Sequence, residues 1–505
     1  MIGAMTTSVC IRDSLGWREV DAIAHGASLE LSAPAEARLR GARAIVESIV
    51  AHGIRAYGVN TGVGALCDTV VDREDQGRLS RSLIMSHAIG VGPLLSAAAT
   101  RAIIAAAVNN HAHGYSGIRP EIVHQLQRFL NRDCVPNVPS GGSVGYLTHM
   151  AHVGLVVIGE GMARVAGRSL PGLQALREIG AEPQVLEAKD GLSLVNGTPC
   201  ATGLAAVALA RIERMLQWAD AAGALTFEVL RGQMAAFAAE SLQLRRSASI
   251  DAVGANLRRL LAGSELLEGS SGDRTQDPLS LRAIPQVHGA ARDVFETTAT
   301  VVDSELSAVT DNPVVAGTVE EPQVHSEAHA VGAALALALD SLAIAVAATA
   351  AMSERRVDRL VNPLVSGLPP FLSAAAGVGS GLMIAQYTVT ALTGENRRLA
   401  APATLDGGST SAQQEDHLCH PTPAALKLLR IAENFETVLA VELLAAAQAH
   451  DLRPPSPARA PGTAAIHRAI RGVVEHYRDD RPLADDLARV RGLLAHRPPQ
   501  LHAPQ

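Results

Sequence analysis

The sequence predicts a mainly α-helical protein organised around a long central helical bundle. Apolar residues make up 48% of the 505 residues, enough for a large core, whereas aromatic residues make up only 3%. A core filled by Ala, Leu and Val suits close helix–helix contacts better than two packed sheets. Long stretches with apolar residues at helical spacing, separated by Gly, Pro and Asp clusters, support the same fold class.

Residues 1–200 are expected to form an N-terminal domain of shorter helices and loops that carry the active site. Ser32 can cap a helix with Pro34 in its first turn and Gly53 at its end. Further patterns predict helices over 72–88, 96–113, 120–130 and 147–159. Glycines and prolines predict irregular loops over 57–64, 86–92 and 135–146.

Residues 201–452 are expected to form the central bundle. Its long helices are predicted over 201–239, 285–309, 326–356, 382–400 and 424–451. A linker over 453–462 contains four prolines, and two short amphipathic helices ending near Leu494 follow it. These form a third segment, 453–505, and we expect no β-rich region.

Composition and charge restrict the classes of partner. A net charge of −7 without a basic run gives no electrostatic footprint for nucleic acid or anionic lipid. Residues 328–352 are apolar, but His329 and Asp340 interrupt them, so we expect a buried bundle helix and no membrane span. The absence of a signal-peptide pattern and five widely spaced cysteines predict a cytoplasmic protein with reduced thiols.

The most informative motif is Gly-Ser-Val-Gly over residues 142–145, which Tyr-Leu-Thr-His-Met-Ala-His follows directly over 146–152. It resembles the signature of the aromatic amino-acid ammonia-lyase and aminomutase family, in which Gly-Ser-Val-Gly precedes Ala-Ser-Gly-Asp-Leu-Ala-Pro-Leu-Ala-His. In that family the Ala-Ser-Gly triplet forms the electrophilic prosthetic group MIO (4-methylideneimidazol-5-one). This chain lacks the triplet, so we expect no cofactor.

Further motifs carry the resemblance into other parts of the chain. Tyr-Gly-Val-Asn-Thr-Gly-Val-Gly over 57–64 resembles the family loop whose tyrosine is the catalytic base, which implies that role for Tyr57. Leu-Val-Asn-Gly-Thr over 194–198 is similar to the family segment whose asparagine binds the substrate carboxylate, here Asn196. Pro199 replaces the glutamine that follows in the family.

Three other positions follow from the same resemblance. Gln-Asp-Pro-Leu-Ser-Leu-Arg over 276–282 implies that Arg282 grips a carboxylate, a task suited to a planar guanidinium, although Leu279 replaces the family's second tyrosine. Gln-Gln-Glu-Asp-His over 413–417 places Glu415 at an active-site glutamate. His87 matches a residue that contacts the substrate side chain in histidine ammonia-lyases, but a histidine that simply ends a helix is an equal alternative.

The resemblance spans roughly residues 30–490, with motifs in the expected order, including Thr-Asp-Asn-Pro over 310–313. It implies the ammonia-lyase (fumarase/aspartase-like) fold and a homotetramer whose active sites combine several subunits. It also implies a small amino-acid-like carboxylate substrate. We assign no metal site, because the family motif accounts for His417 beside Cys419 and His420.

Tyr146 and His149 take the places of the family's aspartate and proline. Three residues apart on one helical face, they could form an acid–base pair. Alternatively, Tyr146 only fills the volume that MIO leaves.

Three functions are consistent with these motifs. The first is a lyase or isomerase that works without MIO by acid–base elimination or addition, with Tyr57 as base, Asn196 and Arg282 as carboxylate clamp, and Tyr146, His149 or Glu415 as proton donor. The second is a non-catalytic ligand-binding or scaffold homologue. The third is a conventional histidine or aromatic amino-acid ammonia-lyase. A base and a clamp together favour the first over the second, and the missing triplet opposes the third.

Overall fold

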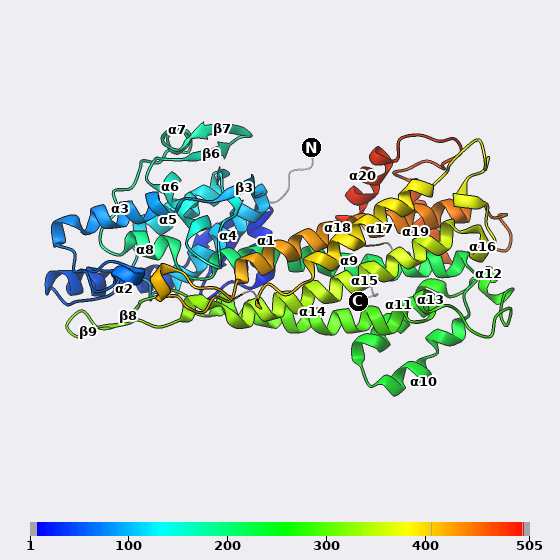
Figure 1. Ribbon diagram of the computed structural model, residues 1–505, viewed down its shortest axis with the longest axis horizontal. Helices are drawn as coiled ribbons and strands as arrows, with labels where there is room; N and C mark the ends of the chain where they lie inside the picture. Colours follow the sequence, from blue (N-terminus) through cyan, green and yellow to red (C-terminus); the bar gives the residue numbers. More distant parts are fainter. Residues whose placement is uncertain (1–7, 406, 497, 499–505) are drawn as a thin grey trace. The chain divides into compact units, whose positions relative to one another are not determined.

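The computed structural model describes residues 8–405, 407–496 and 498, which are mostly helical (Figure 1). The chain divides into two compact units. The first comprises Met1–Ala210, Thr298–Asp340 and Pro402–Leu429, and the second comprises Arg211–Thr297, Ser341–Ala401 and Arg430–Gln505.

The first unit contains the shorter helices and small sheets. Its helices are α1 (Trp17–Ala24), α2 (Ala33–Ala51), α3 (Gln76–His87), α4 (Ala97–Ala112), α5 (Pro120–Asn131), α6 (Thr148–Val157), α7 (Gly172–Glu178) and α8 (Asp190–Val195). Its strands are β1 (Ser8–Ile11), β2 (Ser28–Leu31), β3 (Val91–Leu94), β4 (Cys134–Pro136), β5 (Pro139–Gly141), β6 (Met162–Val165), β7 (Arg168–Pro171), β8 (Val314–Gly317) and β9 (Pro322–His325). Strand β1 pairs with β2 in parallel, and the antiparallel sheets have the orders β3-β5, β4-β6-β7 and β8-β9.

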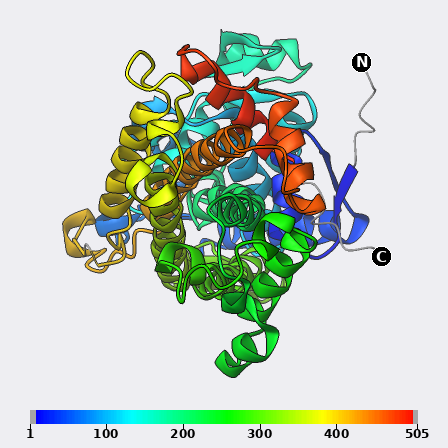
Figure 2. The ribbon, with the colours of Figure 1, turned by 90° about the vertical axis from the view of Figure 1, so that its right-hand side faces the viewer.

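Four long helices belong partly to each unit: α9 (Pro199–Val229), α14 (Ile284–Ser307), α15 (Ala333–Val361) and α18 (Pro421–Asp451). The second unit also contains α10 (Ala239–Leu242), α11 (Ala248–Leu261), α12 (Glu265–Glu268), α13 (Leu279–Arg282), α16 (Pro363–Ser366), α17 (Met383–Leu399), α19 (Pro461–Arg471) and α20 (Leu483–Leu494). Seen end-on in Figure 2, α9 lies at the centre of the long helices. The predicted mainly helical fold with a long central bundle is confirmed.

Buried charges join the bundle helices within the second unit. Arg356 on α15 donates to both oxygens of Glu442 on α18, at 2.5 and 2.9 Å, and neither side chain is exposed. Thr226 on α9 and Ser353 donate to the same carboxylate at 2.9 and 2.5 Å. Because each carboxylate oxygen accepts from two donors, one of them a guanidinium, the buried charge is compensated.

Several predicted boundaries are confirmed by their caps. The Ser32 and Ser96 hydroxyls accept from Ala35 N–H and Ala99 N–H, where helices α2 and α4 begin. These serines satisfy N–H groups that have no partner inside the helix.

Other boundaries differ from the prediction. The expected loop over 135–146 contains β4 and β5, whose partner strands are distant in the sequence. Helix α9 ends at Val229, well before residue 239, because Gly232 N–H turns back to the Phe227 carbonyl at 2.9 Å. Helix α15 begins at Ala333 because the preceding Gly332 has φ 62°.

Two helical segments have the length and apolar composition of a membrane span, Asp190–Val229 and His329–Val361. The most apolar window of the first is entirely buried, whereas 44% of the second is buried. The core helix of a bundle has the same length and composition. All five cysteines are free.

Candidate functional site

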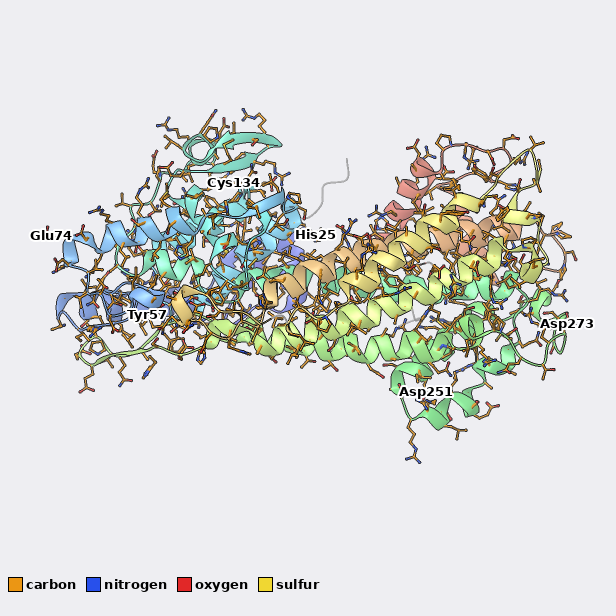
Figure 3. The ribbon with its side chains drawn as sticks, in the orientation of Figure 1. His25, Tyr57, Glu74, Cys134, Asp251 and Asp273 are labelled. Atoms are coloured by element: carbon orange, nitrogen blue, oxygen red, sulfur yellow. The ribbon has the colours of Figure 1, made fainter. Side chains whose placement is uncertain are left out.

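Tyr57 lies in a loop of the first unit (Figure 3). Hydrogen bonds within the loop fix its conformation. The Asn60 side chain accepts from Ala56 N–H and donates to the Ile54 carbonyl, both at 2.8 Å. Gly58 has φ 61°, and a Cβ there would lie 2.1 Å from a Leu192 methyl group, so only glycine fits. The loop thereby presents the Tyr57 phenol, whose oxygen accepts from Gly64 N–H at 3.1 Å.

The Glu415 loop lies against the Tyr57 loop. The Ser411 hydroxyl accepts from Ala65 N–H at 3.1 Å, and Thr410 N–H closes the turn on the Glu415 carbonyl at 2.8 Å. All three residues of the turn Ser411–Gln413 have positive φ, at 53°, 51° and 70°. Such conformations cost on the order of 1–3 kcal/mol each outside glycine and persist where the surrounding contacts impose them. The strained turn therefore fixes the position of Glu415.

Tyr146 enters from the start of α6 and donates its hydroxyl hydrogen bond to Glu415 Oε2. The next residue, Leu147, has φ 73° and ψ −70°, and Thr148 N–H bonds to the Tyr146 carbonyl at 3.0 Å. These values define a γ-turn, a rare and strained conformation for leucine. Leu147 N–H also bonds to the Val195 carbonyl at 2.9 Å, which holds the turn beside the end of α8. The strained residue therefore lies directly after Tyr146, close to the position where the family resemblance places its missing triplet.

The three side chains form one electrostatic cluster. Burial raises the pKa of Tyr57, and the nearby Glu415 charge raises it further, against the opposing effect of Gly64 N–H. Burial likewise raises the pKa of Tyr146 far above its usual value, and the hydrogen bond and charge of Glu415 add to this. Tyr57 also contributes to the shift of Tyr146. Both phenols therefore keep their protons at neutral pH, so two protonated hydroxyl groups lie near one carboxylate.

His149 is not part of this cluster, which corrects the expected pair with Tyr146. Helix α6 begins at Thr148, so Tyr146 precedes the helix and does not share a face with His149. His149 Nε2 bonds to the Ser140 carbonyl at 3.0 Å, and its side chain is almost fully buried. Burial alone would lower the pKa of His149, but Cys200 and the Ser140 carbonyl outweigh it and raise the pKa to about 9.

Asn196 lies in a buried ionic network. Its amide nitrogen donates to Asp311 Oδ1 at 3.3 Å and to the Asn312 carbonyl at 2.5 Å. Lys189, which is not exposed at all, donates to Asp311 Oδ2 at 2.9 Å and to the Ser116 carbonyl at 2.6 Å. The Asn196 amide nitrogen is therefore occupied within the protein, which leaves its carbonyl oxygen and nearby N–H groups for a ligand.

No sequence motif assigns a role to Lys189, although its rarity in this chain singles it out. It is one of only two lysines in a chain with 43 Lys and Arg residues. Its backbone has φ 66° at the start of α8, and burial raises the pKa of Asp311 against the effect of the Lys189 ammonium. A buried lysine in a strained conformation indicates a network that positions other groups.

Two other candidate residues form no hydrogen bond with the cluster among the described residues. His87 ends α3, where its Nδ1 is 3.0 Å from the Ser86 hydroxyl, and burial lowers its pKa. Arg282 belongs to the second unit, where its Nη1 donates to the Asp277 carbonyl at 2.8 Å. Leu279 is 63% exposed. Both His87 and Arg282 stay predictions from the resemblance.

The residues present do not fit the MIO group. No Ala-Ser-Gly run occurs in the 505 residues, and Gly145 is followed directly by Tyr146. The nearest Ser-Gly pair is in β5, where Gly141 pairs with Val91, so its backbone is committed to a strand. Within the described residues, no group of three or more His, Cys, Asp or Glu side chains could hold a metal ion.

Comparisons with known proteins agree over nearly the whole chain. A family model described as aromatic amino acid lyase matches residues 15–472. The histidine ammonia-lyase of Anaeromyxobacter sp. (strain K) is 44% identical, over 97% of this chain and 99% of its own. The tyrosine aminomutase of Streptomyces globisporus superimposes with a TM-score of 0.89 at 34% identity, over 97% of each chain. Histidine ammonia-lyase from Trypanosoma cruzi gives 0.88 at 35% identity, over 97% of this chain and 93% of the other.

The buried network predicts a specific pattern of stability. Lys189→Met leaves the Asp311 carboxylate buried without its cation, so we expect a loss of about 3–5 kcal/mol in the free energy of unfolding. Lys189→Met combined with Asp311→Asn removes that charge and should recover part of the loss. Urea unfolding of the two variants measures the difference. A double variant no more stable than the single one would contradict this account.

Proposed function

The chain belongs to the aromatic amino acid lyase family, and on that premise we propose a carbon–nitrogen lyase that acts on an amino-acid-like carboxylate without MIO. The observation that carries the proposal is the Tyr146–Glu415 hydrogen bond beside Tyr57. Tyr57, Tyr146 and Glu415 are thus proposed to do the work that a self-made electrophile does in the family.

The proposed chemistry is general acid–base elimination, or its reverse. Tyr57, once deprotonated, takes a proton from the carbon next to the one that bears nitrogen, and the carbon–nitrogen bond breaks as the double bond forms. Tyr146 gives its proton to the departing nitrogen, and Glu415 steadies the phenol through the hydrogen bond. This requires an acidified C–H bond or a better leaving group than free ammonia, because no electrophile activates the amine.

The remaining roles follow the resemblance. Arg282 is proposed to bind the substrate carboxylate, Asn196 to contact the substrate through its free carbonyl oxygen, and His87 to contact the substrate side chain. A guanidinium binds a carboxylate through two parallel hydrogen bonds, so Arg282 would also set its orientation. Lys189 and Asp311 act as positioning residues, because they hold the Asn196 amide.

A second candidate is a conventional histidine ammonia-lyase. Identity of 44% to a histidine ammonia-lyase favours it, and so does a histidine at position 87. This candidate requires an electrophile formed elsewhere in the chain, so the two functions differ in their sensitivity to nucleophiles.

Turnover assays with borohydride separate the two candidates. Purified protein is tested with histidine, other amino acids and their unsaturated acids, in both directions, before and after borohydride treatment. We expect the turnover that is found to survive treatment, because phenols and carboxylates are not reduced. Histidine deamination that borohydride abolishes would establish the second candidate.

Tyrosine variants test the proposed roles. Tyr57→Phe and Tyr146→Phe should each lower kcat/KM by roughly 10²- to 10⁴-fold, the usual contribution of a general base or acid. The control is Tyr115→Phe, since Tyr115 is 45% exposed and should tolerate the change. Unchanged turnover in Tyr146→Phe would mean that Tyr146 only fills space.

The raised pKa values also predict a pH profile. Tyr57 must be deprotonated to act, and its pKa is raised above the usual 10, so kcat/KM should climb with pH throughout the range from 7 to 10. Tyr146 keeps its proton over that range because its pKa is also raised, so no decline is expected. A maximum near neutral pH would contradict these assignments.

We also propose that the protein forms a homotetramer, as the resemblance implies. Helix α15 exposes a stripe of small or apolar side chains at alternating spacings of three and four residues, typical of helix–helix interfaces: Ala334, Leu337, Ser341, Ile344, Ala348 and Ala351. Ile344 is 50% exposed. A second copy of the chain is the occupant that we propose for this stripe.

Light scattering tests the assembly. Ile344→Glu should lower the mass from four subunits towards one or two, because a buried carboxylate without a partner disfavours association. The matched control is Leu244→Glu, since Leu244 is 82% exposed on a different segment. An unchanged mass in Ile344→Glu, or an equal loss in the control, would exclude α15 as the interface.

A further inference from the structure

The second unit contains a cavity that the proposed chemistry does not use. It has a volume of about 300 Å³, and its walls come from the end of α9, the α12 segment and the proline-rich linker after α18. Three arginines line it, Arg231, Arg453 and Arg459, together with the buried His450. The cavity is therefore rich in guanidinium groups.

The positive charge of these arginines is mostly uncompensated. Arg231 pairs with Asp273 at 2.6 Å, but that carboxylate is half-exposed. No described Asp or Glu side chain forms an ion pair with Arg453 or Arg459. Burial lowers the pKa of Arg453, and the charge of Arg231 lowers it further, so the two guanidinium groups repel each other.

Two buried N–H donors in the cavity wall have no partner. They are Arg231 Nε and Arg459 Nη1, whereas Arg453 Nε donates to the Val229 carbonyl at 2.9 Å. Buried donors nearly always have an acceptor, and an exception indicates a water or ion that completes the site. Both donors belong to arginines that line the cavity, and the nitrogens themselves are closed off from solvent, so the unfilled hydrogen-bonding capacity lies in the cavity wall.

The other ionisable groups at the cavity do not supply that acceptor. Burial and then the Arg459 charge lower the pKa of His450 to about 3, so the ring is neutral, and its Nε2 donates to the Leu225 carbonyl at 3.1 Å. The buried Glu228 accepts from Ala460 N–H at 2.7 Å and from the Thr463 hydroxyl. Glu228 is therefore engaged by neutral donors, and the guanidinium groups stay without a carboxylate.

We propose that this cavity binds a small organic oxyanion, a carboxylate or a phosphate ester. Guanidinium groups match either anion through paired hydrogen bonds, and the bound charge would offset the repulsion between arginines. A volume near 300 Å³ is at the lower end for ligand sites, so a small metabolite fits and a nucleotide does not. Pro454, Pro455 and Pro457 restrict the backbone of the wall, so binding costs little conformational entropy.

The cavity is connected to the segment that carries Arg282. Arg274 donates to the Arg231 carbonyl at 2.8 Å, and its Nε donates to Asp277 at 2.9 Å. Arg282 in turn donates to the Asp277 carbonyl at 2.8 Å. If Arg282 binds the substrate carboxylate as proposed, an anion on Arg231 would therefore restrict the motion of the segment 274–282 that carries it.

Calorimetric titration of the intact protein tests the proposal. The probes are inorganic phosphate and malonate, each measured in chloride buffer of matched ionic strength, so that the more tightly bound anion identifies the preferred chemistry. We expect saturable binding and a melting temperature that rises with anion concentration. Arg453→Gln and Arg459→Gln should each raise Kd by roughly 10- to 100-fold, as for a lost charged hydrogen bond.

Arg245→Gln is the matched control. It removes one positive charge from the same unit at an exposed position outside the cavity, and Kd should not change. The absence of saturable binding by either anion, or an equal loss in the control, would overturn the proposal. The titration of the unmodified protein decides the matter if one variant fails to fold.

Discussion

The hydrogen bond from Tyr146 to Glu415 is the contact on which the site depends, because it joins two strained loops. One is the γ-turn at Leu147 at the start of α6, and the other is the left-handed turn Ser411–Gln413. The same second turn accepts Ala65 N–H through Ser411, next to the residue that bonds the Tyr57 phenol. The strain of both turns is thus offset by one polar contact and a few backbone hydrogen bonds.

The buried network behind the site has a different role. Lys189, Asp311 and Asn196 are each almost completely buried, and together they join the start of α8 to the segment before β8. Their charges compensate each other where water does not reach, so removing one leaves the others destabilised. The network therefore fixes the backbone at both ends of α8, where Lys189 and Asn196 lie.

Much of the fold could be predicted from the sequence, because caps and apolar spacing are local signals. Ser32 caps its helix as predicted, the helix predicted from residue 96 has Ser96 as its cap, and the long bundle helices follow from runs of Ala and Leu. Strands β4 and β5 could not be predicted, since each has only three residues and depends on a distant partner. The early end of α9 depends on a single turn at Gly232.

The sequence motifs named candidate residues but not the contacts that those residues make. The motifs singled out Tyr57, Tyr146 and Glu415, and the structure brings these three together. The motifs also suggested a pair between Tyr146 and His149, which fails because helix α6 starts two residues after the tyrosine. The roles of Ser411 and Lys189 depend on long-range hydrogen bonds that no local pattern contains.

The proposed chemistry requires that the backbone from Gly142 to Leu147 is ordinary polypeptide with no cyclised group. Mass spectrometry of the intact protein and of the peptide covering this segment measures this directly. We expect for both the unmodified mass that the sequence dictates. A mass lower by two water molecules, in this peptide or in one that contains another Ser-Gly pair, would contradict it.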